Sequence, residues 1–457
     1  MATSSTKNDL LSLSFFDNTS IKSIKYSTTS SDITLEEKEG IFLLPNTIKH
    51  ISNSAFTRSV IEHLDLSAVP GVYIDTNAFK MCNSLKSVIL NPLVFIGPNA
   101  FDSCAKLMSV TFDDSHNNTT NLQNSDSNDC TVIGKHAFYN CCLLMTVANL
   151  PKRVVFEDCA FFKCRNLTGA FYVGGPHQPH LPLDLFAHTA IQRLTIAPGT
   201  LSIGPYMCYN CTLLNHVTTP VSLQEVHNDA FNECSSLQSI HFGSMCTAIG
   251  EQAFGSCIEM HTITIKSEYN VRFGANCFEN CTALQEFVVP KQTSVLPYHM
   301  FLNCVALHTI SGGAALTHIS SYCFAHCIAL LYPGFHAMPK LHSLGNKVFA
   351  ECNSIQSIQL HKTSISHIGG SSFSDLKNLQ TVSLPVTLSS GHLDMFDGCP
   401  ALSTIQIPEH TYSTFLSLLL DSLQPSVALV NLPAPPPPYP FTRVYKTRPS
   451  LPFHMCE

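Results

Sequence analysis

The residues of this chain that could most readily do chemistry are its 20 cysteines and 22 histidines. Cysteines bind zinc, form disulfides or act as nucleophiles, and each of these roles requires a particular spacing. Twelve of them instead recur at nearly regular intervals: Cys82, Cys104, Cys141, Cys164, Cys211, Cys234, Cys257, Cys281, Cys304, Cys327, Cys352 and Cys399. The spacing therefore belongs to a repeat and not to a single site.

A zinc site would need two short pairs of ligands. Cys208 and Cys211 have the separation of one pair, but no second pair follows at the usual loop distance. The slot of the twelve cysteines is filled elsewhere by Ser59, Thr189 and Leu376, which cannot form disulfides and do not suggest a metal site. We therefore interpret the twelve cysteines as a buried structural column, and we expect no metal and no cofactor.

The histidines are scattered over unrelated repeat positions. His177 and His180 form the closest pair with ligand-like spacing, but no carboxylate or cysteine accompanies them as a catalytic metal would require. No Ser-His-Asp or Cys-His order stands out from the repeat. These observations predict a protein without catalytic residues.

We count the repeats from the position three residues before each column cysteine, and we name it the measured position. Successive positions are 22 to 25 residues apart, except for one interval of 37 residues that contains a polar insertion at 113–130, which we expect to be disordered. The fifteen positions are Phe56, Phe79, Phe101, Phe138, Phe161, Phe186, Cys208, Phe231, Phe254, Phe278, Phe301, Phe324, Phe349, Phe373 and Phe396. About fifteen repeats of roughly 23 residues therefore occupy residues 41–408.

Two apolar periods follow one another within a repeat. From Phe101 through Cys104 to Leu107 the step is three residues, which is typical of a short helical or 3-10 turn. From Val110 to Phe112 the step is two, which is typical of a strand. A single unit cannot bury its own apolar face, so we predict a repeat solenoid of α/β-type coils whose strands form a parallel ladder. Glycines such as Gly97, four residues before the measured position, provide positive φ or close contact between coils.

The Ile-Gly, Ala-Phe, Cys and Leu positions at 133–144 and 249–265 resemble the BspA-like leucine-rich repeat family. The resemblance covers about residues 41–408 and implies a horseshoe or rod that binds partners on its surface, with no common catalytic activity. We therefore interpret the chain as a non-enzymatic scaffold for protein–protein interaction. The alternative is a secreted or cell-surface adhesin or receptor-like protein that binds host or matrix proteins or glycans.

Polar residues between the apolar strand positions should face solvent. One outward position is rich in hydroxyl groups, which either solubilise a sheet face or contact a partner across an extended surface. The candidate partner-binding residues at this position are Ser87, Ser109, Thr262, Thr309, Ser357 and Thr381.

The two ends of the chain depart from the repeat. We expect residues 1–40 to form an N-terminal cap or to be partly disordered, and residues 409–424 to form a helix that caps the last coil. Residues 425–457 read as a proline-rich tail. Within it, Pro436, Pro437 and Tyr439 fit the Pro-Pro-x-Tyr form that WW domains bind, and a stiff linker is the alternative.

Charge and cysteine content suggest where the chain works. A net charge of −7 from 32 acidic and 25 basic residues provides no field for nucleic acid, and no apolar stretch has the ~18–20 residues of a membrane-spanning helix. Stacked cysteines about 5 Å apart could mispair in an oxidising compartment, so we predict a cytoplasmic location. Glycosylation acceptors at Asn117 and Asn118, inside the polar insertion, keep the secreted alternative open.

Overall fold

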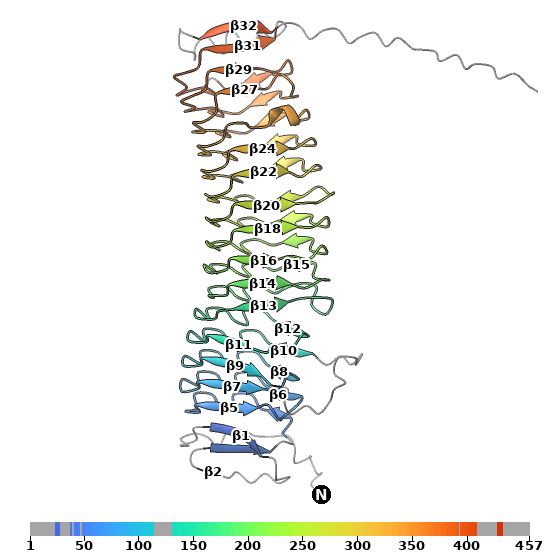
Figure 1. The fold of residues 1–457 in the computed structure, drawn as a ribbon, viewed down its shortest axis with the longest axis vertical. Helices are drawn as coiled ribbons and strands as arrows, with labels where there is room; N and C mark the ends of the chain where they lie inside the picture. Colours follow the sequence, from blue (N-terminus) through green and yellow to red (C-terminus); the bar gives the residue numbers. More distant parts are fainter. Residues whose placement is uncertain are drawn as a thin grey trace, which may run out of the picture.

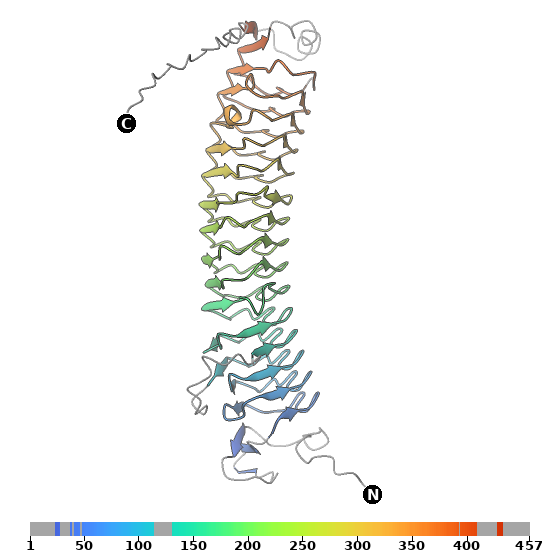
Figure 2. The same cartoon turned by 90° about the vertical axis from the view of Figure 1, so that its right-hand side faces the viewer.

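The computed structural model describes residues 23–27, 37–38, 41–45, 48–113, 130–392, 394–408 and 427–432. These residues form an elongated rod in which each repeat makes one coil (Figures 1 and 2). The prediction of a parallel-strand repeat solenoid of about fifteen coils is confirmed. The insertion at 114–129, the expected helix at 409–424, the Pro-Pro-x-Tyr motif and most of residues 1–40 lie outside the described residues.

One face of the rod carries the strands that the period-two pattern predicts, and we name it the long-strand face. The strands of this face form several short sheets, and within each sheet neighbouring strands pair in parallel and in register, as Ser87 does with Ser109. The strands are β5 (His63–Leu66), β7 (Ser87–Leu90), β9 (Ser109–Phe112), β11 (Thr146–Ala148), β13 (Ala170–Val173), β14 (Arg193–Ile196), β16 (His216–Thr218), β18 (Ser239–Phe242), β20 (Thr262–Ile265), β22 (Glu286–Val289), β24 (Thr309–Gly312), β27 (Ser357–Gln359), β29 (Thr381–Ser383), β31 (Thr404–Pro408) and β32 (Ala428–Leu432).

A second face carries a shorter strand from most coils, and we name it the short-strand face. The sequence pattern predicted only one strand in each repeat, because two or three residues are too few to show an alternating pattern. They are β4 (His50–Ile51), β6 (Val72–Ile74), β8 (Val94–Ile96), β10 (Thr131–Ile133), β12 (Val154–Phe156), β15 (Ser202–Ile203), β17 (Glu225–Val226), β19 (Ala248–Ile249), β21 (Arg272–Phe273), β23 (Val295–Leu296), β25 (His318–Ile319), β26 (Ser343–Leu344), β28 (His367–Ile368) and β30 (Ser390–Gly391).

Both ends of the long-strand face extend beyond the predicted repeat region. At the N-terminal end, β1 (Ser23–Ser27) pairs in parallel with β3 (Ile41–Pro45) and with β5, while β2 (Glu37–Lys38) pairs antiparallel with β3. At the other end, β32 pairs in parallel with β31. Parts of the expected N-terminal segment and of the expected tail therefore belong to the strand ladder.

The segment between the two strands of a coil differs from the expected helical turn. The Lys80 N–H donates to the Asn77 carbonyl (3.0 Å), but the Phe79 N–H donates to Ala100 in the next coil (2.7 Å). Asn77 and Met81, two residues to either side of Phe79, both have a φ of 57°. A 3-10 helix directs every N–H within its own turn, whereas here alternate N–H groups bind the next coil. The only helix among the described residues is the 3-10 helix η2 (Phe335–Ala337).

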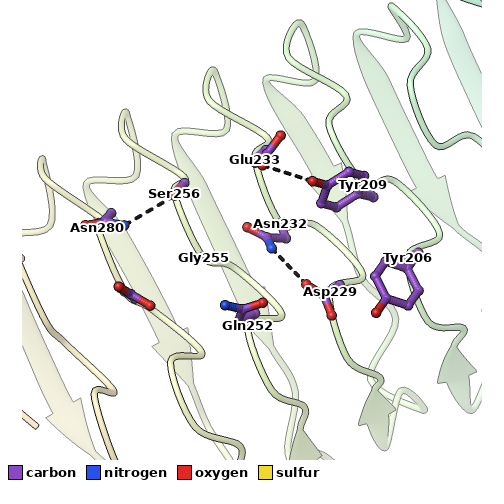
Figure 3. A pocket seen from close by; sticks show the side chains of 10 residues that line it. Tyr206, Tyr209, Asp229, Asn232, Glu233, Gln252, Gly255, Ser256 and Asn280 are labelled. Atoms are coloured by element: carbon purple, nitrogen blue, oxygen red, sulfur yellow. Dashed lines mark hydrogen bonds between the residues drawn. The ribbon is translucent and has the colours of Figure 1, made fainter.

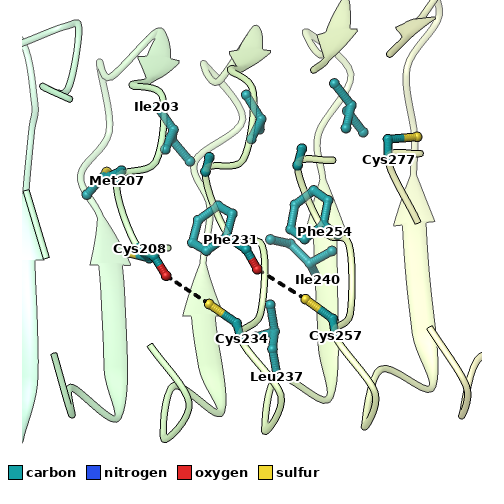
Figure 4. Packing of buried hydrophobic residues seen from close by; sticks show 14 of the residues in the cluster. Ile203, Met207, Cys208, Phe231, Cys234, Leu237, Ile240, Phe254, Cys257 and Cys277 are labelled. Atoms are coloured by element: carbon teal, nitrogen blue, oxygen red, sulfur yellow. Dashed lines mark hydrogen bonds between the residues drawn. The ribbon is translucent and has the colours of Figure 1, made fainter. Parts of the chain in front are cut away.

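The core consists of columns that run along the rod. The Phe79 and Phe101 rings stack with centroids 5.2 Å apart, and the rings of Phe231 and Phe254 stack at 5.3 Å. Figure 4 shows the second pair with the neighbouring cysteines. Burial of apolar surface is the dominant favourable term in folding, and aromatic rings bury a large area each. These columns therefore hold the coils together.

A side chain replaces a strand in one coil. Where the short-strand face lacks a strand between β12 and β15, the Gln178 amide accepts from the Phe156 N–H (3.1 Å) and donates to its carbonyl (2.6 Å). Gln178 is 7% exposed. Its amide therefore bonds β12 as a backbone peptide group would.

Replacing Gln178 with leucine should lower the free energy of unfolding by about 2–4 kcal/mol, because it leaves two buried backbone groups of Phe156 without partners. Denaturant titration followed by circular dichroism measures this loss. Gln192→Leu, at an exposed position, is the matched control and should change stability by less than about 0.5 kcal/mol. Equal stability of the two variants would contradict this role.

Candidate functional site

The cysteine column has a repeated hydrogen bond. Each of the twelve column thiols donates to the backbone carbonyl of the measured position in the preceding coil, with S–O distances of 3.0–3.3 Å. Figure 4 shows two of these bonds, from Cys234 to Cys208 and from Cys257 to Phe231. Eleven of the twelve cysteines are buried, and Cys399 is half-buried. The thiol thus supplies a small apolar volume together with a donor to the neighbouring coil.

Burial raises the pKa of most of the column thiols, whereas at Cys211 the effect of burial is outweighed by hydrogen bonds with Cys208 and Thr189, which lower the pKa of that thiol. Burial raises the pKa of Cys257 well above its ordinary value and that of Cys281 to about 12. The thiolate is the nucleophile and the metal ligand, so these buried thiols are poor candidates for either role. Across the described ranges, no group of three or more His, Cys, Asp or Glu side chains could hold a metal ion. None of the 19 described cysteines forms a disulfide, and the cytoplasmic location stays a prediction.

The predicted hydroxyl residues lie along one line of the long-strand face. Ser87 pairs with Ser109, and Ser357 pairs with Thr381. Thr262 pairs with Ser239, whereas Thr309 lies opposite the exposed Glu286. The structure therefore brings the six residues into one column but not into one cluster. Their contact with a partner stays a proposal.

A hollow of about 480 Å³ lies on the side of the rod formed by the turns between the two strands (Figure 3). We name this surface the turn side and the hollow the turn-side groove. Its lining residues come from four consecutive coils: Tyr206, Tyr209, Asp229, Asn232, Glu233, Gln252, Gly255, Ser256, Glu279 and Asn280.

Backbone geometry places these side chains on the turn side. Tyr206, Asp229 and Gln252 occupy the left-handed position two residues before the measured one, with φ of 52°, 56° and 50°. In the coil of Phe254, the residue directly after the measured position is Gly255. The coils before and after it have Asn232 and Glu279 at that position. A Cβ at Gly255 would lie 2.9 Å from the side-chain oxygen of Asn232, so glycine at this position leaves room for the Asn232 amide in the lining of the hollow.

The acidic groups of the groove have neutral partners. Glu233 accepts from the Tyr209 hydroxyl (3.0 Å), Asp229 accepts from the Asn232 amide (2.8 Å), and Glu279 accepts from the Asn276 amide. Asp229 is 8% exposed. Within the part of the chain that the structure describes, no Lys, Arg or His side chain forms an ion pair with these three carboxylates.

The tyrosines of the groove are held protonated. Burial and then the Glu233 carboxylate raise the pKa of Tyr209, so its hydroxyl remains a donor. The negative charge of Asp229 raises the pKa of Tyr206. The groove thus offers two neutral aromatic rings beside three carboxylates, a combination that attracts cations through both ion pairing and the ring faces.

Aromatic side chains continue from the groove along the turn side. The Tyr139 and Phe162 rings stack with centroids 5.3 Å apart, and edge-on contacts of 5.5 Å and 5.3 Å lead through His188 to Tyr209. We name Tyr139, Phe162, His188 and Tyr209 the aromatic strip. It connects three further coils to the groove.

The groove residues were not among the predicted sites. A signal was present, because Asp, Asn and Ser recur two residues before or after the measured position, where left-handed φ favours such residues. Gly255, which stands where other coils have larger residues, was a second signal. Neither signal shows which side chains become neighbours, because those lie in different coils.

A second hollow, of about 590 Å³, lies where β11, β13 and β14 end. It is lined by Tyr172, Pro176 and His177 among others, and Tyr172 is 54% exposed. Its only Lys or Arg is Lys152, and it contains no carboxylate. Its lining therefore does not indicate whether a partner would be acidic or basic.

Parallel strands on two faces, a core of stacked Phe, Cys and Leu columns and coils of about 23 residues define a leucine-rich repeat solenoid. The family model described as BspA type leucine rich repeat region matches residues 11–130, 115–168, 201–331 and 316–418. The chain belongs to this family. The stretch between matched segments, 169–200, includes Gln178, whose side chain replaces a strand.

A solved structure from Bacteroides ovatus agrees with this fold. A leucine-rich repeat protein from Bacteroides ovatus ATCC 8483 is 21% identical, with a TM-score of 0.56 over 76% of this chain and 92% of that chain. A leucine rich cell surface protein from Faecalibacterium prausnitzii A2-165 is 22% identical, with a TM-score of 0.41 over 88% of this chain and 91% of that chain. The comparison with curated proteins finds no match.

Family membership indicates a protein-interaction scaffold, a role for which leucine-rich repeats are generally used without catalysis. In the described segments, no helix is both long and apolar enough to cross a membrane.

Proposed function

We propose that this rod is a protein-binding scaffold whose turn-side groove takes a basic, extended segment of a partner protein. The observation that carries the proposal is the grouping of Tyr206, Tyr209, Asp229, Glu233 and Glu279 around one hollow, with no cation paired to the carboxylates among the described residues.

Two physical effects favour a cationic ligand here. The negative charge of a carboxylate that accepts only from neutral donors is not balanced by a neighbouring cation. An arginine or lysine of a partner would form a stronger, charge-assisted bond with it. A guanidinium or ammonium group over a tyrosine face gains about 0.5–2 kcal/mol more. The net charge of −7 would also attract a basic partner over longer distances.

The hydroxyl column of the long-strand face is proposed as a further contact surface for a protein partner. Its residues are neutral and stand in register, so they suit recognition of a flat surface more than capture of a charged side chain. A WW-type domain at Pro436, Pro437 and Tyr439 stays a proposal of the same kind.

The groove is tested by fluorescence anisotropy with a labelled octapeptide of alternating arginine and glycine. We expect Glu233→Gln/Glu279→Gln to weaken binding roughly tenfold or more, because two charge-assisted bonds are lost. The binding of the unchanged protein should also weaken with added salt, since the ion pairs are partly exposed.

A matched control separates the groove from the overall charge. Glu259→Gln/Glu268→Gln removes the same charge at two exposed positions outside the groove lining and should leave the affinity within about twofold. Equal weakening in both double variants would show that the peptide responds to net charge, and the groove proposal would then fail.

A further inference from the structure

The segment after β32 has a composition complementary to the turn-side groove. Residues 433–448 contain Arg443, Lys446 and Arg448 and no acidic residue. Tyr445 lies between the first two of these cations. This sequence supplies three positive charges to a groove that holds three carboxylates without a described cationic partner.

The distances allow this segment to reach the groove of its own chain. From β32 to the coil of Gly255 there are seven steps along the rod, or about 34 Å at a strand spacing of about 4.8 Å. Eight residues, 433–440, span about 25 Å in the polyproline II form that their sequence predicts. The following residues add about 3.3 Å each, so Arg443 to Arg448 come within roughly 35–50 Å of Leu432. This range covers the axial distance and the step from the long-strand face to the turn side.

The proline run restricts where the cations can go. A polyproline II segment is semi-rigid, so in this predicted form residues 433–440 would keep the basic residues away from the end of β32 and would reduce the entropy lost when they bind. Nearer that end, the exposed Asp375 and Asp397 supply two carboxylates in neighbouring coils. The groove, in contrast, offers three carboxylates and two rings together.

We propose that the basic segment 443–448 occupies the turn-side groove of its own chain and competes with the basic segment of a partner. The inference rests on the proposed function, because the same carboxylates would bind both ligands. Binding of a partner would then require release of the tail, so the apparent affinity is lowered by the fraction of molecules in which the tail is bound.

Charge reversal in the full chain tests this competition. With the labelled arginine–glycine octapeptide, Arg443→Glu/Lys446→Glu/Arg448→Glu should tighten binding at least tenfold. Lys340→Glu/Lys362→Glu/Lys377→Glu makes the same change in net charge at exposed positions and should tighten binding less than threefold. Equal effects of the two triple variants would overturn the inference and leave the proposed function standing.

A second measurement does not depend on the octapeptide. Zero-length carbodiimide cross-linking of the intact protein, followed by mass spectrometry, should join Lys446 to Glu233, Glu279 or Asp229 within one chain. A mixture of ¹⁵N-labelled and unlabelled protein identifies links between copies, and a majority of such links would overturn the inference in favour of a second copy. Absence of these links would overturn it as well. Failure of the octapeptide to bind either triple variant would defeat the proposed function, whereas the cross-links would still decide whether the tail lies in the groove.

Discussion

Replacing Phe254 with alanine is expected to lower the free energy of unfolding by about 3–5 kcal/mol. The ring is fully buried and stacks between Phe231 at 5.3 Å and Phe278 at 5.8 Å. Its removal leaves a cavity between two coils, and the columns on either side cannot collapse into it without breaking the hydrogen bonds between coils. Denaturant titration followed by circular dichroism measures the loss.

Two further variants make this expectation specific. Val221→Ala, at a side chain that is 65% exposed, should cost less than about 0.5 kcal/mol. Hydrogen exchange should localise the effect of Phe254→Ala to neighbouring coils, because each repeat of a solenoid contacts only its neighbours. A loss below about 1 kcal/mol, or loss of protection spread evenly over the rod, would contradict the role given to the phenylalanine column.

Replacing Gly274 with alanine should destabilise the rod by roughly 3 kcal/mol, at the upper end of what overpacking costs. An added Cβ would lie 2.2 Å from the backbone nitrogen of Glu251 in the preceding coil. The Gly274 N–H also donates to the Ile249 carbonyl at 2.7 Å, so the two coils cannot move apart without losing that bond. Thermal unfolding compared with the unchanged chain measures the effect.

Gly71→Ala is the matched control for this substitution. Gly71 has a φ of 70°, and an added Cβ there would meet nothing within 4 Å. Alanine at that position should cost only the roughly 1–2 kcal/mol of a left-handed backbone. If Gly274→Ala proved no more harmful than Gly71→Ala, close approach between coils would not be the reason for glycine at this position.

The glycine column shows how far a local pattern can be interpreted. The recurrence of Gly97 and Gly274 indicated either positive φ or close contact between coils, and the structure shows close contact. Positive φ occurs instead at Asn77 and Met81, beside the measured position Phe79. The prediction of a 3-10 turn was wrong because alternate N–H groups of this segment bond to the next coil. The residues Asn77 and Met81 adopt left-handed φ, which a 3-10 turn does not have.

Other differences follow from contacts between coils. The replacement of a strand by the Gln178 side chain has no periodic signature, since one buried amide in a divergent coil looks like a surface glutamine in the sequence. The short strands of the second face, such as Val94–Ile96, are defined by pairing with neighbours and not by their own composition. Pairing depends on register between coils, which a single repeat does not contain.

The sequence by itself determined the length of the coil, the number of coils and the identity of the core columns. This was possible because every coil buries the same apolar positions, so Phe, Cys and Leu recur at these positions in the sequence of each repeat. Only the tertiary structure decided which polar side chains become neighbours on the turn side. Tyr209, Asp229 and Glu279 come from different coils, and they meet because inter-coil hydrogen bonds set the register while left-handed residues direct side chains outward.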